Sequence, residues 1–201
     1  GVYTLEIDAT SDNTGLYAIE VTDPAHPVWR GSFAMPGGAT SVDLQGRLAY
    51  VTSAWDGLSI VDVGDLPGVA WLGVYDTPGN AWDVSVAGAL AYVADGAAGL
   101  QIIEVSDPTH PIQRGVYSTL RDVQGTTVVG NLVYVADGDG GLRIMDATDP
   151  ANLTLRGSLD TPGWANRVSV NGNLAFVADG TGLQIIEVAD PVNPVLRGAY
   201  E

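Results

Sequence analysis

Two loop segments place tryptophan beside hydrogen-bonding side chains: residues 77–83 read TPGNAWD and residues 161–167 read TPGWANR. Aromatic planes stack on sugar rings, while amide and carboxylate groups hydrogen-bond to sugar hydroxyls. The same residue types also suit a protein-binding surface, since Trp and Arg are frequent in binding hot spots. Alternatively, the tryptophans pack one structural unit against the next. The candidate ligand- or partner-binding residues are Trp55, Thr40, Asn80, Trp82, Asp83, Asp122, Gln124, Trp164, Asn166 and Arg167.

Asp83 and Asp122 are the only carboxylates that we would place in a hydrolytic site. A glycosidase usually needs two carboxylates about 5–10 Å apart. No Ser-His-Asp arrangement can be placed, because His26 and His110 both precede proline and fall in turns away from the candidate residues. We expect a non-enzymatic protein, with a glycosidase or lyase as the less favoured alternative.

Metal and thiol chemistry have little support in the sequence. The chain has no Cys, which excludes disulfides, zinc–thiolate sites and thiol nucleophiles. The segment ADGDGG at residues 136–141 offers Asp137 and Asp139 to calcium, but a calcium site needs about six oxygen ligands or more. A Gly-rich hairpin loop explains this segment better. We expect no metal and no cofactor.

The charge balance limits the partners. The chain has 24 acidic and 8 basic residues, all of the latter Arg, and a net charge of -16. Phosphate binding needs a cationic face, so this balance argues against nucleic acid and against an anionic membrane surface. No apolar run approaches the roughly 18 residues that span a bilayer. The excess of acidic residues is also explained if their only role is to keep the protein soluble.

The candidate residues belong to a repeat. The pair Gly-Leu recurs at Gly15, Gly57, Gly99, Gly141 and Gly182, in steps of 42, 42, 42 and 41 residues. Around each pair, short segments rich in Val, Ile, Leu and Tyr return between Gly, Asp, Asn or Pro, which is typical of strands and turns. Successive apolar residues, as at Ile102-Ile103, predict burial on both faces. Four short antiparallel strands in about 42 residues predict one blade of a β-propeller, so residues 1–201 are expected to form a single all-β domain.

The recurring text YVADG…GLQIIEVSDPTHP…RG.Y resembles the LVIVD-repeat β-propellers, a family found mostly in bacterial secreted and surface proteins. The resemblance covers residues 15–201. It implies a propeller fold and a location outside the cell or on its surface. It implies no common chemistry.

Five blades are the simplest count. The Gly-Leu segment and the outermost segment each occur five times, but the innermost segment occurs four times. Before Gly15 there is room for one strand, near residues 2–8, so we expect an incomplete first blade and a chain that is a piece of a longer polypeptide. The unpaired strand edges of an open blade invite pairing with another chain.

Residues that recur in the copies are interpreted as architecture. Asp-Pro pairs predict turns in which the Asp side chain accepts a backbone N–H two residues on. An Arg near the start of the outermost strand is expected to pair with Asp or Glu on a neighbouring strand. Trp29 and Trp71 lie in the outermost strands of the first and second copies and are expected to be packing or rim residues. The Asp-Pro pairs begin at Asp23, Asp107, Asp149 and Asp190, and the arginines are Arg30, Arg114, Arg156 and Arg197.

Residues that differ between the copies carry the functional prediction, because loops on a rigid scaffold are where function lies. Ser41, Asp83, Gly125 and Arg167 share one loop position in the repeat. We therefore expect a non-enzymatic binding or scaffolding propeller, extracellular or at the cell surface, that contacts a protein partner or assembles with itself. A carbohydrate-binding propeller with a tryptophan-lined face is the alternative.

Overall fold

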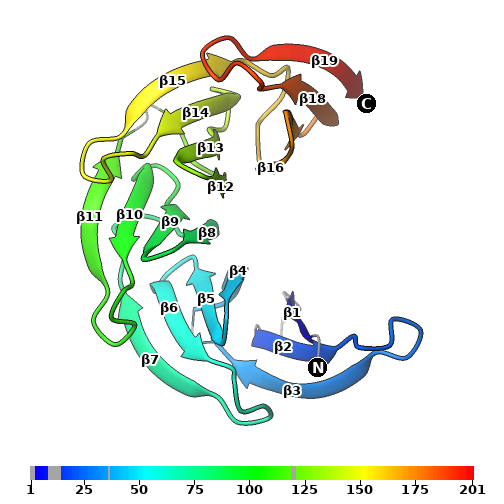
Figure 1. Cartoon of the computed structure of the whole chain (residues 1–201), viewed down its shortest axis with the longest axis vertical. Coiled ribbons are helices and arrows are strands. Elements are labelled where there is room, and N and C mark those ends of the chain that lie inside the picture. Colours follow the sequence, from blue (N-terminus) through cyan, green and yellow to red (C-terminus); the bar gives the residue numbers. More distant parts are fainter. Residues whose placement is uncertain (1–2, 9–14, 36, 119–120) are drawn as a thin grey trace.

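The computed structural model describes residues 3–8, 15–35, 37–118 and 121–201, which form five antiparallel sheets in chain order (Figure 1). The first sheet holds β1 (Tyr3–Asp8), β2 (Gly15–Glu20) and β3 (Val28–Ala34). The second holds β4 (Ala39–Gln45), β5 (Leu48–Ser53), β6 (Gly57–Asp62) and β7 (Ala70–Tyr75). The third holds β8 (Asp83–Ala87), β9 (Leu90–Ala94), β10 (Leu100–Glu104) and β11 (Ile112–Tyr117). The fourth holds β12 (Gly125–Val129), β13 (Leu132–Ala136), β14 (Leu142–Asp146) and β15 (Thr154–Leu159). The fifth holds β16 (Arg167–Asn171), β17 (Leu174–Ala178), β18 (Leu183–Glu187) and β19 (Val195–Tyr200).

The all-β, propeller-like fold class is confirmed, since every regular element in the described ranges is a strand. The predicted strand near residues 2–8 is β1, and residue 2 lies outside the described residues. As predicted, this first sheet is short of a strand. The described part of the chain contains no helix that is long and apolar enough to cross a membrane.

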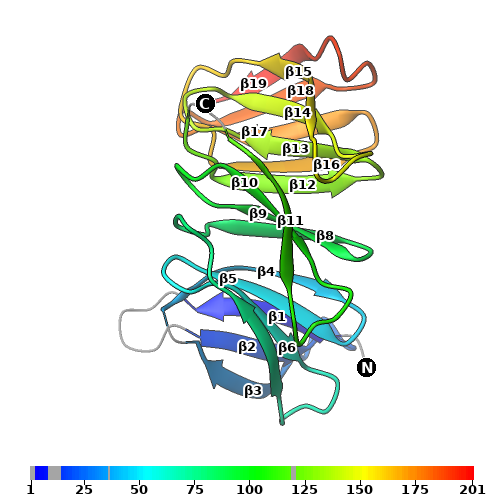
Figure 2. The same cartoon turned by 90° about the vertical axis from the view of Figure 1, so that its left-hand side faces the viewer.

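The sheets follow one another around a centre. In the four-stranded sheets the first strand lies innermost and the last outermost (Figure 1), and the side view shows the sheets stacked in order from the first to the fifth (Figure 2). Neighbouring inner strands β4, β8, β12 and β16 are in contact. The arc is open between the first and the fifth sheet (Figure 1).

The core lies between successive sheets rather than inside any one of them. Ile102 packs with Val133 and Val135 of the fourth sheet, whereas the adjacent Ile103 packs with Tyr50 and Leu58 of the second. All six residues are at most 2% exposed. Because successive side chains of a strand point to opposite faces, an inner sheet must be apolar on both, as the sequence predicted.

At the outer rim, glycines in the outermost strands allow close backbone contact between successive sheets. In each of the second, third and fourth sheets, the outermost strand carries a Gly against which the Asp-Pro turn of the next sheet packs. A Cβ at Gly73, Gly115 or Gly157 would lie 2.4, 2.3 or 2.3 Å from the carbonyl oxygen of Pro108, Pro150 or Pro191, respectively. No side chain fits there without moving a backbone, which explains why Gly recurs in the outermost segment.

The recurring charged residues act as predicted. In all four Asp-Pro turns the Asp Oδ1 accepts the backbone N–H two residues on, at 3.0 Å. A side-chain donor in the same turn, together with this N–H, holds the pKa of each carboxyl group below its ordinary value. The four arginines pair with Glu20, Glu104, Asp146 and Glu187 on the adjacent strand. Both histidines lie exposed in these turns, beside Asp23 and Asp107.

The glycine contacts yield a matched pair of variants. Gly157→Ala should lower the free energy of unfolding by about 2 kcal/mol, because the added methyl group overpacks against the Pro191 turn. Gly198→Ala, at the same repeat position, should change it by less than about 0.5 kcal/mol, because no atom lies within 4 Å of its Cβ position. Urea unfolding followed by circular dichroism measures both. Equal losses would contradict this description of the rim.

Candidate functional site

The inner strands bring one predicted group of residues together at the centre. Asp83, at the start of β8, accepts a hydrogen bond from Ser41 Oγ of β4 and from Arg167 Nη1 of β16, both at 2.5 Å to Oδ1. The backbone N–H of Thr126 on β12 donates to Oδ2 at 3.0 Å. Arg167 Nη2 also reaches the carbonyl oxygen of Thr40 (3.4 Å). The shared repeat position therefore forms a polar cluster that joins the second to the fifth sheets.

This cluster explains what Asp83 does in the fold. The side chain is buried, and its oxygens accept hydrogen bonds from the second, fourth and fifth sheets. Hydrogen bonds to a charged group are stronger than neutral ones, so the carboxylate ties the inner strands together. The geometry favours a structural role for Asp83 over that of a free acid or base.

Asp122, the second candidate carboxylate, has a different environment. It lies before β12, half-buried, and its Oδ1 is buried without a hydrogen bond to any described residue. A Cβ at Gly96 would lie 3.1 Å from this oxygen and 3.4 Å from Trp82 Nε1. Asp122 and the half-buried Trp82 thus flank the loop that follows β9.

The other predicted loop residues are spread over this face. Trp164 is 43% exposed and its ring packs on Gly138, in the loop after β13. Asn166 Nδ2 donates to the Trp164 carbonyl (2.8 Å), and Thr40 Oγ1 donates to the Ala81 carbonyl (2.7 Å). Asn80 is exposed and Gln124 half-buried. Of these residues, Thr40 and Trp164 contact the loop of a neighbouring sheet, while Asn166 bonds within its own loop.

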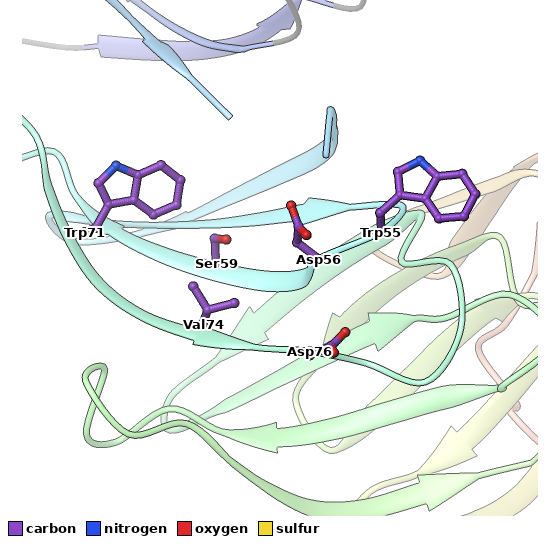
Figure 3. A pocket seen from close by; sticks show the side chains of 6 residues that line it. All are labelled: Trp55, Asp56, Ser59, Trp71, Val74 and Asp76. Atoms are coloured by element: carbon purple, nitrogen blue, oxygen red, sulfur yellow. The ribbon is translucent and has the colours of Figure 1, made fainter. Parts of the chain in front are cut away.

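Trp55, the remaining candidate tryptophan, lines an open pocket on the second sheet. The pocket measures about 460 Å³, and its walls come from the β5–β6 turn, β6, β7 and the residue after β7. Trp71 and Trp55 stand at its two ends, with Asp56, Ser59 and Val74 between them (Figure 3). Asp76 completes the lining.

The prediction that Trp71 is a packing or rim residue is incomplete. Its side chain is 44% exposed and shares the pocket with Trp55, which is 76% exposed. Ser59 pairs with both Val51 and Val74, and Val51 packs with Leu16 of the first sheet. Trp71 therefore lies on the face of the second sheet that is turned toward the first sheet, where it can line a pocket.

A small residue creates the pocket. At the Ser59 position of the repeat, the next three sheets carry Gln101, Arg143 and Gln184. Gln101 fills its site, since its Nε2 donates to the Ala98 carbonyl (3.0 Å) and its Oε1 accepts from Gln113 (2.9 Å). Serine cannot reach that far, so the space remains open between the tryptophans. A long-to-short change at one repeat position is the sequence signal that would have located the site.

The pocket is acidic as well as aromatic. The carboxylates of Asp56 and Asp76 form no ion pair with any described residue. Asp56 lies over Gly37, whose positive φ of 79° and missing side chain leave room for it. Two indole faces beside two available carboxylates are a favourable environment for a cation.

The aspartates that follow the second strand of the third and fifth sheets, Asp95 and Asp179, hold loops. Burial raises the pKa of Asp95, although Thr77 Oγ1 (2.6 Å) and the Gly79 N–H (3.0 Å) donate to it. Burial acts in the same direction on Asp179, but hydrogen bonds from Thr181 and Gly163 hold its pKa below the ordinary value.

The two carboxylates considered as calcium ligands each form an ion pair with an arginine. Asp137 pairs with Arg143, and Asp139 pairs with Arg121 at 2.7 Å. A carboxylate that already pairs with arginine is a weaker ligand for a metal cation, and a cation site needs several converging oxygens. This arrangement favours the interpretation of ADGDGG as a structured hairpin loop.

Comparison with known proteins places the chain in a family. The LVIVD repeat model matches residues 36–77, 78–119, 120–161 and 162–201, so the chain belongs to the LVIVD repeat family. A search of curated proteins gives no match.

Solved structures share the fold. A protein from Lactobacillus plantarum aligns with a TM-score of 0.81 and 14% identity over 98% of this chain and 66% of its own. A functionally unknown protein from Desulfotomaculum acetoxidans gives 0.71 and 15% over 98% and 65%. The computationally designed Ika4 protein gives 0.60 and 8% over 77% and 93%. The chain thus spans about two thirds of the length of the two natural proteins.

The two candidate carboxylates should differ in their contribution to stability. Asp83→Ala should lower the free energy of unfolding by about 3 kcal/mol, because it leaves the Thr126 N–H and Ser41 without their acceptor. Asp122→Ala should change it by less than about 0.5 kcal/mol, since its buried Oδ1 has no described donor. Urea unfolding measures both, and a larger loss for Asp122→Ala would refute the assigned roles.

Proposed function

We propose that this LVIVD repeat protein is a non-enzymatic binding and scaffolding module of five blades, acting outside the cell or on its surface, and that its partner is a protein. A basic segment of the partner, most favourably with more than one arginine, lies along the pocket from Trp55 to Trp71, so that each indole stacks on a different side chain. The observation that supports this most is the open pocket of about 460 Å³, with two exposed indoles and two carboxylates that form no ion pair with the part of the chain that the structure describes.

The chemistry of the pocket favours arginine. A guanidinium group stacks on aromatic faces and is weakly hydrated, so it loses little on leaving water. Asp56 and Asp76 supply the opposite charge, and the net charge of -16 attracts basic segments from a distance. The turn that carries Trp55 is held in place, since the buried Ser53 Oγ accepts the backbone N–H of Asp56 at 3.0 Å, and a preformed turn lowers the cost of binding.

A neutral sugar is the second candidate. The exposure of both tryptophans supports it, because indole rings also stack on sugar rings. The two ligands differ in their response to salt. Binding of a cation weakens as salt screens the carboxylates, whereas stacking of a neutral sugar does not.

The test is a titration of the chain with a short arginine peptide and a matched glutamine peptide, followed by calorimetry at low and high salt. Only the arginine peptide should bind, and salt should weaken it. Trp55→Ala and Trp71→Ala should each lower the affinity at least about tenfold, because each removes one stacking face.

Trp164→Ala is the control, since Trp164 has nearly the same exposure as Trp71 but lies outside the pocket. Equal binding of both peptides would contradict a cation site. Loss of binding in Trp164→Ala with Trp71→Ala unaffected would move the site to the loop face. A glycan that binds independently of salt would favour the second candidate.

A further inference from the structure

The pocket between Trp55 and Trp71, the Trp55–Trp71 pocket, follows the strand direction of the second sheet. Trp71 pairs with Val61 of β6, and Val74 pairs with Ser59, two residues nearer the start of that strand. Val61 and Ser59 share a face because the side chains of a strand alternate, so Trp71 and Val74 share that face too. The lining therefore runs along the sheet from Trp71 past Val74 toward the β5–β6 turn.

The two indoles are too far apart for one side chain to stack on both. Asp76 follows Val74 by two residues, so four residues of strand separate its level from that of Trp71. At about 3.3 Å a residue, the pocket spans roughly 13 Å between these two levels. Trp55 belongs to the β5–β6 turn and stands at the Asp76 end (Figure 3). Two side chains of the partner are needed to cover both rings.

The two ends of the pocket differ in charge. Asp56 and Asp76 both lie on the Trp55 side of Ser59 and Val74 (Figure 3). Neither carboxylate forms an ion pair within the described ranges of the chain. A cation that stacks on the Trp55 indole therefore also gains attraction from two carboxylates.

At the Trp71 end, the carboxylates of the same sheet are already paired. Asp62 lies opposite Ala70, the residue before Trp71, and forms an ion pair with Arg47 at 2.7 Å. The same arginine pairs with Asp65, in the turn after β6, at 3.2 Å. A side chain that stacks on Trp71 thus gains contact with the ring, while its charge contributes little.

We propose that the pocket binds an extended partner segment with two flat side chains four residues apart, an arginine on Trp55 and either an arginine or an aromatic residue on Trp71. Side chains i, i+2 and i+4 of an extended segment share a face, and i to i+4 spans roughly 13 Å, as the pocket does. Aromatic rings stack on indole as guanidinium groups do, so charge is needed only at the Trp55 end. This inference rests on the proposed function and specifies the partner of the same site.

The spacing is tested with short peptides that have blocked ends, titrated into the chain by calorimetry at low salt. Arg-Gly-Ser-Gly-Arg holds its arginines at i and i+4. Arg-Gly-Ser-Arg-Gly and Arg-Gly-Arg-Gly-Ser have the same composition but hold them at i+3 and i+2. The first should bind at least about fivefold more tightly than the other two, because only its arginines reach both indoles from one face.

The difference between the ends is tested by replacing one arginine with tyrosine. Because an extended segment can run in either direction, both Arg-Gly-Ser-Gly-Tyr and Tyr-Gly-Ser-Gly-Arg are titrated. The tighter of the two should bind within about threefold of the two-arginine peptide, since tyrosine supplies the ring that stacks on Trp71. Tyr-Gly-Ser-Gly-Tyr should show no binding, because nothing in it pairs with Asp56 and Asp76.

Two variants of the chain form a matched pair. Asp76 and Asp160 each directly follow the outermost strand of their sheet and are exposed, but only Asp76 lines the pocket. Asp76→Asn should weaken the tighter single-arginine peptide at least about threefold, and Asp160→Asn should leave it unchanged. Trp71→Ala should bind that peptide no better than one with glycine in place of tyrosine, because the ring that contacts the tyrosine is gone.

The possible results distinguish this inference from the proposed function. The three two-arginine peptides could bind equally, with Trp55→Ala and Trp71→Ala still weakening each of them. That result would overturn the spacing and leave the arginine site in place. Binding of the two-arginine peptide alone, with neither single-arginine peptide bound, would show that charge is needed at the Trp71 end as well and would also overturn the inference. Failure of every arginine peptide to bind would overturn both proposals.

Discussion

The close stacking of one sheet on the next is the constraint on which this molecule depends. A single sheet of four short strands cannot bury its apolar faces alone, so each gains its core from its neighbours. The contact has an apolar part, such as Leu100 against Val133, and a rim part, where the Pro150 turn packs on Gly115. Both parts need the same residues at the same spacing in every copy, and the repeat in the sequence follows from that need.

Because the stacking contact fixes the frame, the remaining positions are free to differ. Asp83 and Arg167 use this freedom at the centre, where unequal residues at one repeat position form a cross-sheet ion pair. Ser59 uses it near the rim, where a short side chain leaves the space that Gln101 fills in the next sheet. Structural and binding roles thus arise from departures from the repeat, while the repeat itself supplies rigidity.

Much of the fold could be predicted from the sequence, because its causes recur. The turns at the Asp-Pro pairs and the Arg ion pairs depend only on residues close in sequence. Because the positions of Asp107 and Arg114 each recur in four copies of the repeat, their contacts could be predicted. The grouping of Ser41, Asp83 and Arg167 also followed from the period. The Trp55–Trp71 pocket was missed: Ser59 is a short residue at a position that carries Gln101 in the next sheet, but the register with Val74 is needed to show that a pocket results. The exposure of Leu183 could not be predicted from a repeat that makes it identical to Leu100.

The stacking account is tested most directly by hydrogen exchange of the single chain at low concentration. It predicts that the middle strands of the third and fourth sheets, covered on both faces, exchange most slowly, and that β2, β17 and β18 of the two end sheets exchange faster. Local opening should become easier toward both ends of the arc. Uniform protection across the five sheets, or the strongest protection in the fifth, would contradict the claim that each sheet is stabilised chiefly by its neighbours.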